Sequence, residues 1–455
     1  HELIWWSERS GWGHLYLYDL KSGELKHPIT LKNSATGLNN EWLVRDVLHV
    51  DTQRREIIIQ TAGRAISGSE LKVPGRHPYY RDICRVGIDT GEINTLFSRD
   101  EDVMVHYPES YLIFLDNYLQ RSGTETQGVS PSGDYIVMTR SRVDKAPVTE
   151  LLDRDGKNIL ELEITDTTSL PSQWTWPESV QVLAADGVTP LYGVLFRPSD
   201  FSPDKSYPLI NYVGSGPWMS MIPVGSFNSA RDIYMDWHYF NAAAFAELGF
   251  MVLQLDSRGT PLRGKRFQDY SYGWVPDAIC AEDHRAALQQ LAQHYPAIDR
   301  ERIGSYCAAY PGGLTNFLAS QDLYKVHVQS NVLDMRLISC SMKSDVWEGR
   351  EGPDHTKCYP EQLVKNLTQK LLIMHPLMGR QAIIFPLSSA FRVIQALIDA
   401  NKDFDMLMTP NNVADVFSNS AFGHYNTRRI WDYFVKHLMK ENPPEAFDLK
   451  ASILP

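Results

Sequence analysis

The pattern of hydrophobic and polar positions divides the chain into two parts. From residue 1 to about 165, short runs that mix β-branched and aromatic residues with polar breaks predict strands, as at 14–18 and 56–60. Each turn signal is followed by another strand-like run, as in hairpins. These signals lie at 19–23, 89–91, 130–134 and 155–156. Repeated antiparallel hairpins predict part of an all-β propeller, with room for about three blades.

From about residue 178 the pattern changes to alternating strands and helices. Apolar runs predict buried strands at 208–213, 250–255, 302–306, 371–374 and 404–408. Helices are predicted at 240–248, 283–294, 387–400 and 427–439. Continuous apolar strands that alternate with helices predict a doubly wound, mostly parallel α/β sheet covered on both faces. We therefore expect blades at 1–165, a linker at 166–177, an α/β domain at 178–447 and a tail at 448–455.

Composition narrows the class of protein. A length of 455 residues predicts two to three domains, and 43% hydrophobic with 22% charged residues is typical of a globular protein. The net charge of −11 argues against a nucleic-acid surface. No run of about 18 uncharged apolar residues predicts a membrane span. The five cysteines form no C-x-x-C pair, which favours free thiols, so we expect no metal and no cofactor.

The candidate chemistry centres on residues 302–313, which read RIGSYCAAYPGG. Serine hydrolases of the α/β class carry their nucleophile as Gly-x-Ser-x-Gly on a strand–turn–helix of this kind. Ala309 stands at the serine position, and none of the serines in the chain has glycines at both −2 and +2. Ser305 and Cys307 fall on the preceding strand. Pro311 replaces a glycine after the turn, but proline is tolerated in the first turn of a helix.

Four further motifs accompany this turn. They are GVLFRP at 193–198, DSRGT at 256–260, ANKDFD at 400–405 and RRIWDYF at 428–434. Together these motifs resemble the C-terminal part of a dipeptidyl peptidase IV-like member of the prolyl oligopeptidase (S9) family of serine peptidases, from residue 1 to about 447. The resemblance implies an N-terminal propeller and a C-terminal α/β-hydrolase domain with the active site between them. It also implies cleavage of peptides after proline or alanine.

The resemblance also places the acid and the base of a catalytic triad. The acid should lie in 375–385, but this stretch holds no carboxylate, and Gly379 or Arg380 takes its place. The base should lie in the loop after the last strand, where Ala414 or Asp415 stands. Both groups are therefore predicted to be replaced.

The oxyanion donor of the family is a tyrosine after the first buried strand, and Gly214 stands there. Tyr212, two positions earlier and on the same face of the strand, is the alternative donor, although core packing is the commoner role of such a tyrosine. By contrast, Asp256 and Arg258 remain where the resemblance implies that they brace the sheet and its propeller interface.

Four independent replacements favour a catalytically inactive member of the family that binds a peptide or protein or serves as a scaffold. The alternative is a serine-type peptidase, dipeptidyl or acylaminoacyl, with a rearranged active site. Its candidate groups are Ser305, Ser215 or Cys307 as nucleophile and His424 as base, with Tyr310 as a further vestigial residue.

The resemblance carries expectations about partners and location as well. It implies a peptide or protein ligand in the cleft between propeller and hydrolase domain, and a homodimer through the closing helices. The sequence starts at His1 without Met and inside a strand pattern, so we expect a fragment of a longer precursor that could have carried a signal peptide. A periplasmic or secreted location fits the family better than a cytoplasmic one.

Overall fold

The computed structural model describes most of the chain and divides it into two compact units. The described residues are 1–31, 41–64, 76–105, 128–214, 216–217, 220–227, 233–273, 278–308, 311–332, 359–378, 385–410 and 421–445. The N-terminal unit contains His1–Leu170 together with Pro223–Tyr239 and Leu262–Gln268. The C-terminal unit contains Pro171–Ile222, Phe240–Pro261 and Asp269–Pro455.

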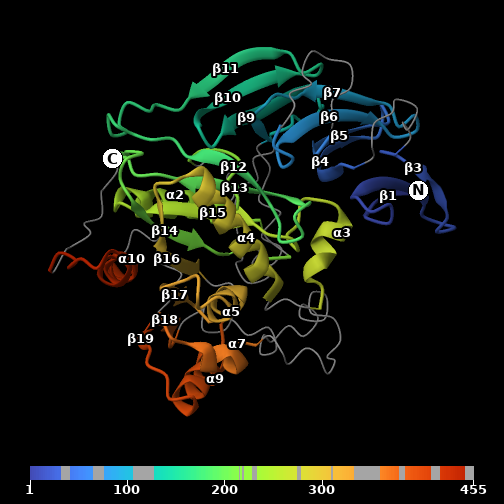
Figure 1. The fold of residues 1–455 in the computed structure, drawn as a ribbon. Coiled ribbons are helices and arrows are strands. Elements are labelled where there is room, and N and C mark those ends of the chain that lie inside the picture. Colours follow the sequence, from blue (N-terminus) through green and yellow to red (C-terminus); the bar gives the residue numbers. More distant parts are fainter. Residues whose placement is uncertain are drawn as a thin grey trace. The chain divides into compact units, whose positions relative to one another are not determined.

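The N-terminal unit is built from three antiparallel sheets (Figure 1). The first contains β1 (Glu2–Ser7), β2 (His14–Asp19) and β3 (Leu25–Pro28). The second contains β4 (Leu43–Asp51), β5 (Glu56–Ala62), β6 (Arg81–Gly87) and β7 (Ile93–Phe97). The third contains β8 (Asp102–Val105), β9 (Tyr135–Arg142), β10 (Lys145–Asp153) and β11 (Asn158–Ile164). Neighbouring strands in each sheet are consecutive in the chain, which confirms the predicted series of hairpins.

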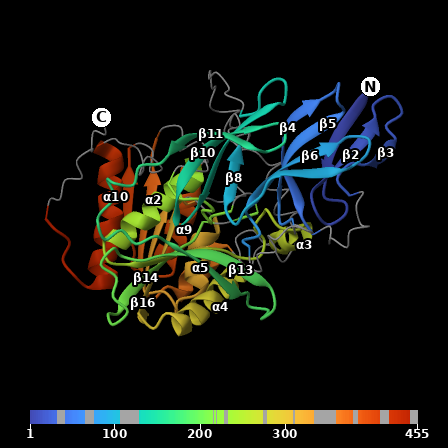
Figure 2. The same cartoon turned by 90° about the horizontal axis from the view of Figure 1, so that it is seen from above.

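Strand β5 lies between two hydrophobic cores, which explains its unbroken run of isoleucines at 57–59. Ile57 and Ile59 pack into a core shared with Leu15 and Leu17 of the first sheet, whereas Ile58 packs into the core shared with the third sheet. Successive side chains of a strand point to opposite faces, so a strand between two sheets is buried on both sides. The second sheet is therefore packed face to face with both of its neighbours (Figure 2).

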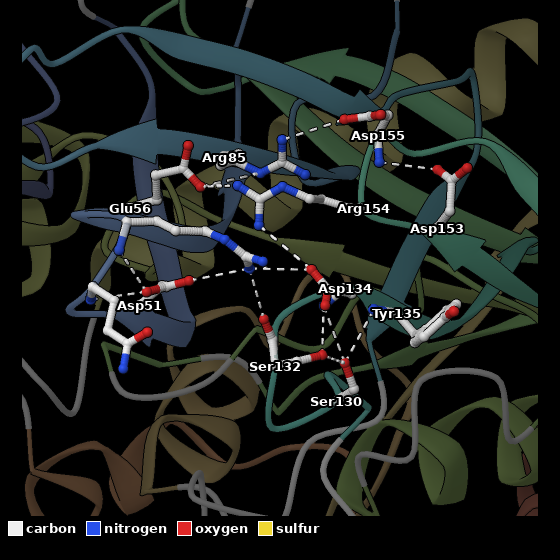
Figure 3. A network of polar contacts seen from close by, with 12 residues as sticks. Asp51, Glu56, Arg85, Ser130, Ser132, Asp134, Tyr135, Asp153, Arg154 and Asp155 are labelled. Carbon is white, nitrogen blue, oxygen red and sulfur yellow. Dashed lines mark hydrogen bonds and ion pairs between the residues drawn. The ribbon is translucent and has the colours of Figure 1, made fainter.

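Arginines at the turns join the second and third sheets (Figure 3). Arg54, in the turn between β4 and β5, lies 3.1 Å from the carboxylate of Asp134, which precedes β9. Arg154, after β10, pairs with Glu56 of β5 and lies 3.7 Å from Asp134. Isolated surface pairs contribute little, but a shared carboxylate between two arginines makes a network that fixes the turns relative to one another.

The C-terminal unit is built on an eight-stranded mixed sheet with the order β12-β13-β15-β14-β16-β17-β18-β19. The strands are β12 (Glu178–Leu183), β13 (Pro190–Phe196), β14 (Tyr207–Tyr212), β15 (Met251–Asp256), β16 (Ile298–Ala308), β17 (Val326–Ser330), β18 (Lys370–Pro376) and β19 (Asp405–Thr409). Strands β14 to β19 run parallel, and β12 and β13 pair antiparallel. The predicted alternation of strands and helices is confirmed.

Helices cover both faces of this sheet, as a doubly wound fold requires. The helices are α2 (Ile233–Glu247), α4 (Ala278–His294), α5 (Pro311–Ala319), α7 (Pro360–Leu363), α9 (Leu387–Asp399) and α10 (Ala421–Phe434), and α3 (Lys265–Gln268) belongs to the N-terminal unit. On one face, Phe317 of α5 stacks on His327 of β17 at 4.8 Å. On the other, Phe245 of α2 and Phe434 of α10 pack around Tyr306 of β16.

The predicted helix starts at 240, 283 and 427 are wrong by more than a turn, because α2, α4 and α10 begin earlier. Their first turns mix polar, aromatic and small residues without a clear apolar period, so the pattern alone assigned only the later turns.

Candidate functional site

The candidate site is the edge of the sheet at which the parallel strands end, since ligands of open α/β sheets bind at the carboxyl ends of the strands. The positions at which the family carries its nucleophile, acid, base and oxyanion tyrosine each follow a predicted strand in the sequence. Of these positions the structure describes Gly214, which follows β14. The others lie outside the described residues, namely Ala309, Tyr310, Gly379, Arg380, Ala414, Asp415 and, from the alternative site, Ser215.

A strand and a helix flank the nucleophile position, as predicted. Strand β16 ends at Ala308 and helix α5 begins at Pro311, which confirms that this proline starts a helix. A Cβ atom at Gly313 would overlap the Cβ and Sγ atoms of Cys307. The first turn of α5 therefore approaches β16 so closely that only glycine fits, and Cys307 is fully buried beneath it.

Met221 fills the space beside the oxyanion position. A Cβ atom at Gly214 would lie 2.7 Å from Cε and 2.8 Å from Sδ of Met221, whose side chain is fully buried. A side chain at 214 would thus start inside the volume that Met221 occupies. Gly214 itself offers no hydroxyl to a developing oxyanion.

Asp256 holds this loop in place. Its Oδ1 accepts a hydrogen bond of 2.8 Å from the backbone N–H of Met221, and its Oδ2 accepts one of 2.5 Å from Oγ of Ser220. Asp256 is the last residue of β15 and is fully buried. A carboxylate that accepts from a backbone N–H and a hydroxyl orders the chain that carries them, so Asp256 positions Met221 against Gly214.

Arg258 braces the same unit by a different set of contacts. Its Nη2 lies 2.7 Å from Oδ1 of Asp283, its Nη1 lies 3.0 Å from Oδ2 of Asp186, and its guanidinium lies over the ring of Tyr270 at 4.1 Å. Asp283 is fully buried on α4. The paired geometry ties the loop after β15 to this helix.

Tyr212 lies in the core of the C-terminal unit. Its ring is fully buried at 4.9 Å from that of Tyr306, and its hydroxyl accepts a hydrogen bond of 3.3 Å from Nδ2 of Asn241 on α2. Burial raises the pKa of the Tyr212 hydroxyl well above its ordinary value of 10. The side chain is therefore part of the packing under α2.

Ser305 makes a contact that the sequence did not reveal. Its Oγ lies 2.6 Å from Nδ1 of His327 on the neighbouring strand, and Nε2 of that histidine lies 3.2 Å from Oε1 of Gln329. Both Ser305 and His327 are buried. Desolvation lowers the pKa of His327 to about 4, so the imidazole is neutral at pH 7.

His375 is a second histidine that the sequence analysis did not assign. Its Nδ1 accepts a hydrogen bond of 3.2 Å from the backbone N–H of Val332, and its Nε2 donates one of 3.2 Å to the carbonyl of Phe385. Burial lowers its pKa to about 4. His375 thus ties the end of β17 to the segment that leads into α9.

His424, the candidate base of a rearranged site, lies in the first turn of α10 and is half-buried. Within the described ranges its side chain makes no hydrogen bond to a serine or cysteine. The described residues also contain no group of three His, Cys, Asp or Glu side chains that could hold a metal ion, and no described helix is long and apolar enough to cross a membrane.

Two sequence profiles match most of the chain. The profile of the prolyl oligopeptidase family (Peptidase_S9) matches residues 237–441. The profile of the dipeptidyl peptidase IV N-terminal region matches residues 1–144. The match at residues 1–144 falls on the antiparallel sheets, and the match at residues 237–441 falls on strands β15 to β19 and the helices between them.

Individual dipeptidyl peptidases are also similar to this chain. Dipeptidyl peptidase 8 of Homo sapiens and that of Mus musculus are each 23% identical over 287 residues, or 61% of this chain. The chain spans 30% of the length of each of these relatives. The crystal structure of Porphyromonas gingivalis dipeptidyl peptidase 4 superposes with a TM-score of 0.73 at 19% identity, covering 96% of this chain and 55% of that one. At this identity the structural likeness shows a shared fold.

Proposed function

Because the chain belongs to the prolyl oligopeptidase family, as a member similar to dipeptidyl peptidase IV, we propose that it is a catalytically inactive relative that binds a peptide or protein. One observation carries the proposal. Strand β16 ends at Ala308 and helix α5 starts at Pro311, as the strand and helix of a serine-hydrolase nucleophile turn would, and the residue at the serine position is Ala309. A methyl group cannot attack a carbonyl.

The surroundings of that turn support the same proposal. Gly214 replaces the oxyanion tyrosine and is packed against Met221. The sequence offers no carboxylate in 375–385 and no histidine in the loop that follows β19. Members of a catalytic triad act as a unit, and removal of one costs several orders of magnitude in rate, so these replacements together argue against peptide hydrolysis.

A peptidase with a rearranged site is the second candidate, and the Ser305–His327 hydrogen bond is the observation that favours it. The distance matches a nucleophile and its base, but both side chains are buried under α5, where a peptide carbonyl has no access. A histidine with a pKa near 4 is also a weak base. Cys307 is equally buried. We therefore favour the inactive member.

Binding would use the carboxyl edge of the sheet, where relatives of this fold class place their ligands. The ligand is a peptide or protein, a homodimer through the closing helices is the proposed assembly, and a periplasmic or secreted location fits the family. The family's active members cleave peptides, so peptide recognition without cleavage is the simplest function that retains the fold.

Activity-based labelling tests the proposal. We expect no labelling by a fluorophosphonate probe and no release of p-nitroaniline from Gly-Pro-p-nitroanilide, with an active dipeptidyl peptidase as the positive control. Stoichiometric labelling that disappears in Ser305→Ala or Cys307→Ala would establish the rearranged peptidase instead. In the inactive case, peptides from a proline-containing library should raise the melting temperature, since a ligand of the folded state stabilises it. A library without any such peptide would overturn the binding role.

A further inference from the structure

The segment Pro223–Tyr239 belongs to the N-terminal unit, although the chain on both sides of it belongs to the C-terminal unit. The chain leaves the C-terminal unit where this segment begins and returns to it where the segment ends. Of this segment the structure describes residues 223–227 and 233–239. One residue in each described part, Ser226 and Tyr239, contacts the turn between β9 and β10 of the third sheet. We call these two residues the anchors.

Ser226 is the first anchor. Its backbone N–H donates a hydrogen bond of 3.0 Å to Oγ of Ser141, and its own Oγ donates one of 2.5 Å to the carbonyl of Lys145. Ser226 is fully buried, and the next residue, Phe227, has a φ of 51°. A bulky residue adopts this left-handed conformation only where its surroundings impose it. The first anchor is therefore held in one defined conformation.

Tyr239 is the second anchor. Its hydroxyl donates a hydrogen bond of 3.4 Å to the carbonyl of Val143, and its ring lies 5.8 Å from that of Phe227. The side chain of Tyr239 is buried. Tyr239 lies on α2, which begins in this segment and continues to Glu247 in the C-terminal unit. Backbone hydrogen bonds connect each turn of a helix to the next, so α2 links the second anchor firmly to the residues that follow it.

Both anchors lead to Gly214. Met221, five residues before the first anchor, fills the space beside Gly214, because a Cβ atom at Gly214 would lie 2.7 Å from its Cε. Asn241, two residues after the second anchor, donates a hydrogen bond of 3.3 Å to the hydroxyl of Tyr212, which lies two residues before Gly214. The β9–β10 turn is thus connected to Gly214 by two routes, one through each anchor.

The first route is short and is held along its length. Asp256 accepts hydrogen bonds from Ser220 and from the backbone N–H of Met221, and the next residue, Ile222, is fully buried. Closely packed segments of this kind change between discrete arrangements and do not deform continuously. A displacement of the β9–β10 turn is therefore passed on to Met221.

We propose that the β9–β10 turn controls the conformation of the chain around Gly214, and that Ser141, Ser226 and Tyr239 act as positioning residues for it. A change that separates the turn from the anchors would withdraw Met221 from Gly214 and alter the carboxyl edge of the sheet. A change at Gly214 would likewise be felt at the turn, because energetic coupling between two sites is reciprocal. The proposal holds whether or not this edge binds a peptide.

Hydrogen–deuterium exchange on the full 455-residue chain, followed by mass spectrometry, tests the proposal. Ser141→Ala removes the acceptor of the Ser226 N–H and changes no residue of the C-terminal unit. Peptides that cover residues 212–222 should exchange about tenfold faster in this variant, since one buried hydrogen bond that opposes local opening is lost. Peptides that cover β18 should exchange as in the wild type.

Thr149→Ala is the matched control. It removes a hydrogen bond of 2.9 Å between Thr149 and Thr139 in the same sheet, and this bond does not involve an anchor. Exchange at 212–222 should therefore stay unchanged. Tyr239→Phe keeps the ring and removes only the hydroxyl, so it should accelerate exchange at 212–222 less than Ser141→Ala does.

The reciprocal experiment measures the turn. Gly214→Ala, which forces Met221 to move, should accelerate exchange in peptides that cover residues 143–147. Unchanged exchange at 212–222 in both Ser141→Ala and Tyr239→Phe would overturn the proposal. So would equal acceleration at 212–222 and at β18 in Ser141→Ala, because the substitution would then lower only the stability of the whole fold. Equal acceleration at 212–222 in Thr149→Ala and Ser141→Ala would overturn it as well.

Discussion

The hydroxyl of Ser305 donates a hydrogen bond of 2.6 Å to Nδ1 of His327. The direction of this bond follows from Gln329, whose Nε2 donates to the carbonyl of Asn331 and whose Oε1 therefore faces His327. That oxygen accepts the proton on Nε2 of the imidazole, which leaves Nδ1 as an acceptor. These hydrogen bonds satisfy polar groups buried inside the sheet, so their role is to stabilise the core.

Removing the hydroxyl should therefore affect stability. Ser305→Ala leaves Nδ1 of His327 as a buried acceptor without its donor, which typically costs about 1–3 kcal/mol of unfolding free energy. Urea denaturation followed by circular dichroism measures this. Ser172→Ala, at an exposed position, is the control and should leave stability unchanged. A variant with unchanged stability and lost probe labelling would assign Ser305 to catalysis instead.

Stability should decrease with acid because of the buried histidines. The pKa values of His327 and His375 are lowered from 6.5 to about 4, so the unfolded state binds more protons than the folded state between these values. The stabilising contribution is complete above pH 6.5 and is lost as the pH falls toward 4, by about 1.4 kcal/mol per pH unit for each histidine. Urea titrations at pH 7.5, 6 and 5 measure the slope. His327→Gln should reduce it, and an unchanged slope would contradict this assignment.

The sequence predicted the strands β14, β15, β16, β18 and β19 of the C-terminal unit, because apolar runs are local, but it did not predict β12, β13 or β17. It could not predict His327 or Met221 as neighbours of the candidate site. His327 is one of three polar residues in the buried strand β17, and its partner Ser305 lies 22 positions away. Met221 reaches Gly214 because Asp256, on another strand, holds the loop. Such contacts depend on tertiary packing, which periodicity does not encode.

The contact between Gly214 and Met221 predicts a coupled pair of substitutions. Gly214→Ala adds a Cβ that would lie 2.7 Å from Cε of Met221, and overpacking of a core typically costs about 1–3 kcal/mol. Met221→Ala makes room for that methyl group, so the double variant should be more stable than the sum of the single effects predicts. A double-mutant cycle from melting curves measures the coupling. Strict additivity would show that Met221 does not occupy this space.

Gly313→Ala should also destabilise the fold, but a second substitution should rescue it less completely than at Gly214. The added methyl group would overlap both the Cβ and the Sγ of Cys307. Cys307→Ala removes the sulfur but keeps the Cβ, so it should rescue only part of the lost stability, in contrast to the pair at Gly214. Full rescue by Cys307→Ala would mean that α5 can move away from β16, against the close approach described above.

Breaking the ion pair between Arg258 and Asp283 should cause a large loss of stability. Asp283 is fully buried, and Arg258→Met would leave its carboxylate without the paired guanidinium. Breaking a buried ion pair by removing one partner costs about 3–5 kcal/mol, whereas Arg258→Met/Asp283→Leu should recover much of this. Arg285→Met is the control: Arg285 lies on α4, as Asp283 does, but its ion pair with Asp322 is exposed, so the loss should be less than about 1 kcal/mol. Equal losses in the two single variants would contradict the structural role of Arg258.

Restoring the nucleophile alone should not restore a peptidase. Ala309→Ser supplies the hydroxyl at the family position, but a serine hydroxyl is a weak nucleophile without a base and an oxyanion donor. The sequence places Ala414 or Asp415 where the base belongs, and Gly214 where the tyrosine belongs. We therefore expect no fluorophosphonate adduct by intact-protein mass spectrometry in Ala309→Ser. An adduct in this variant that is absent from the wild type would show that a base still reaches position 309. His424→Ala would then identify that base, because loss of the adduct would assign the role to His424 and its persistence would exclude it.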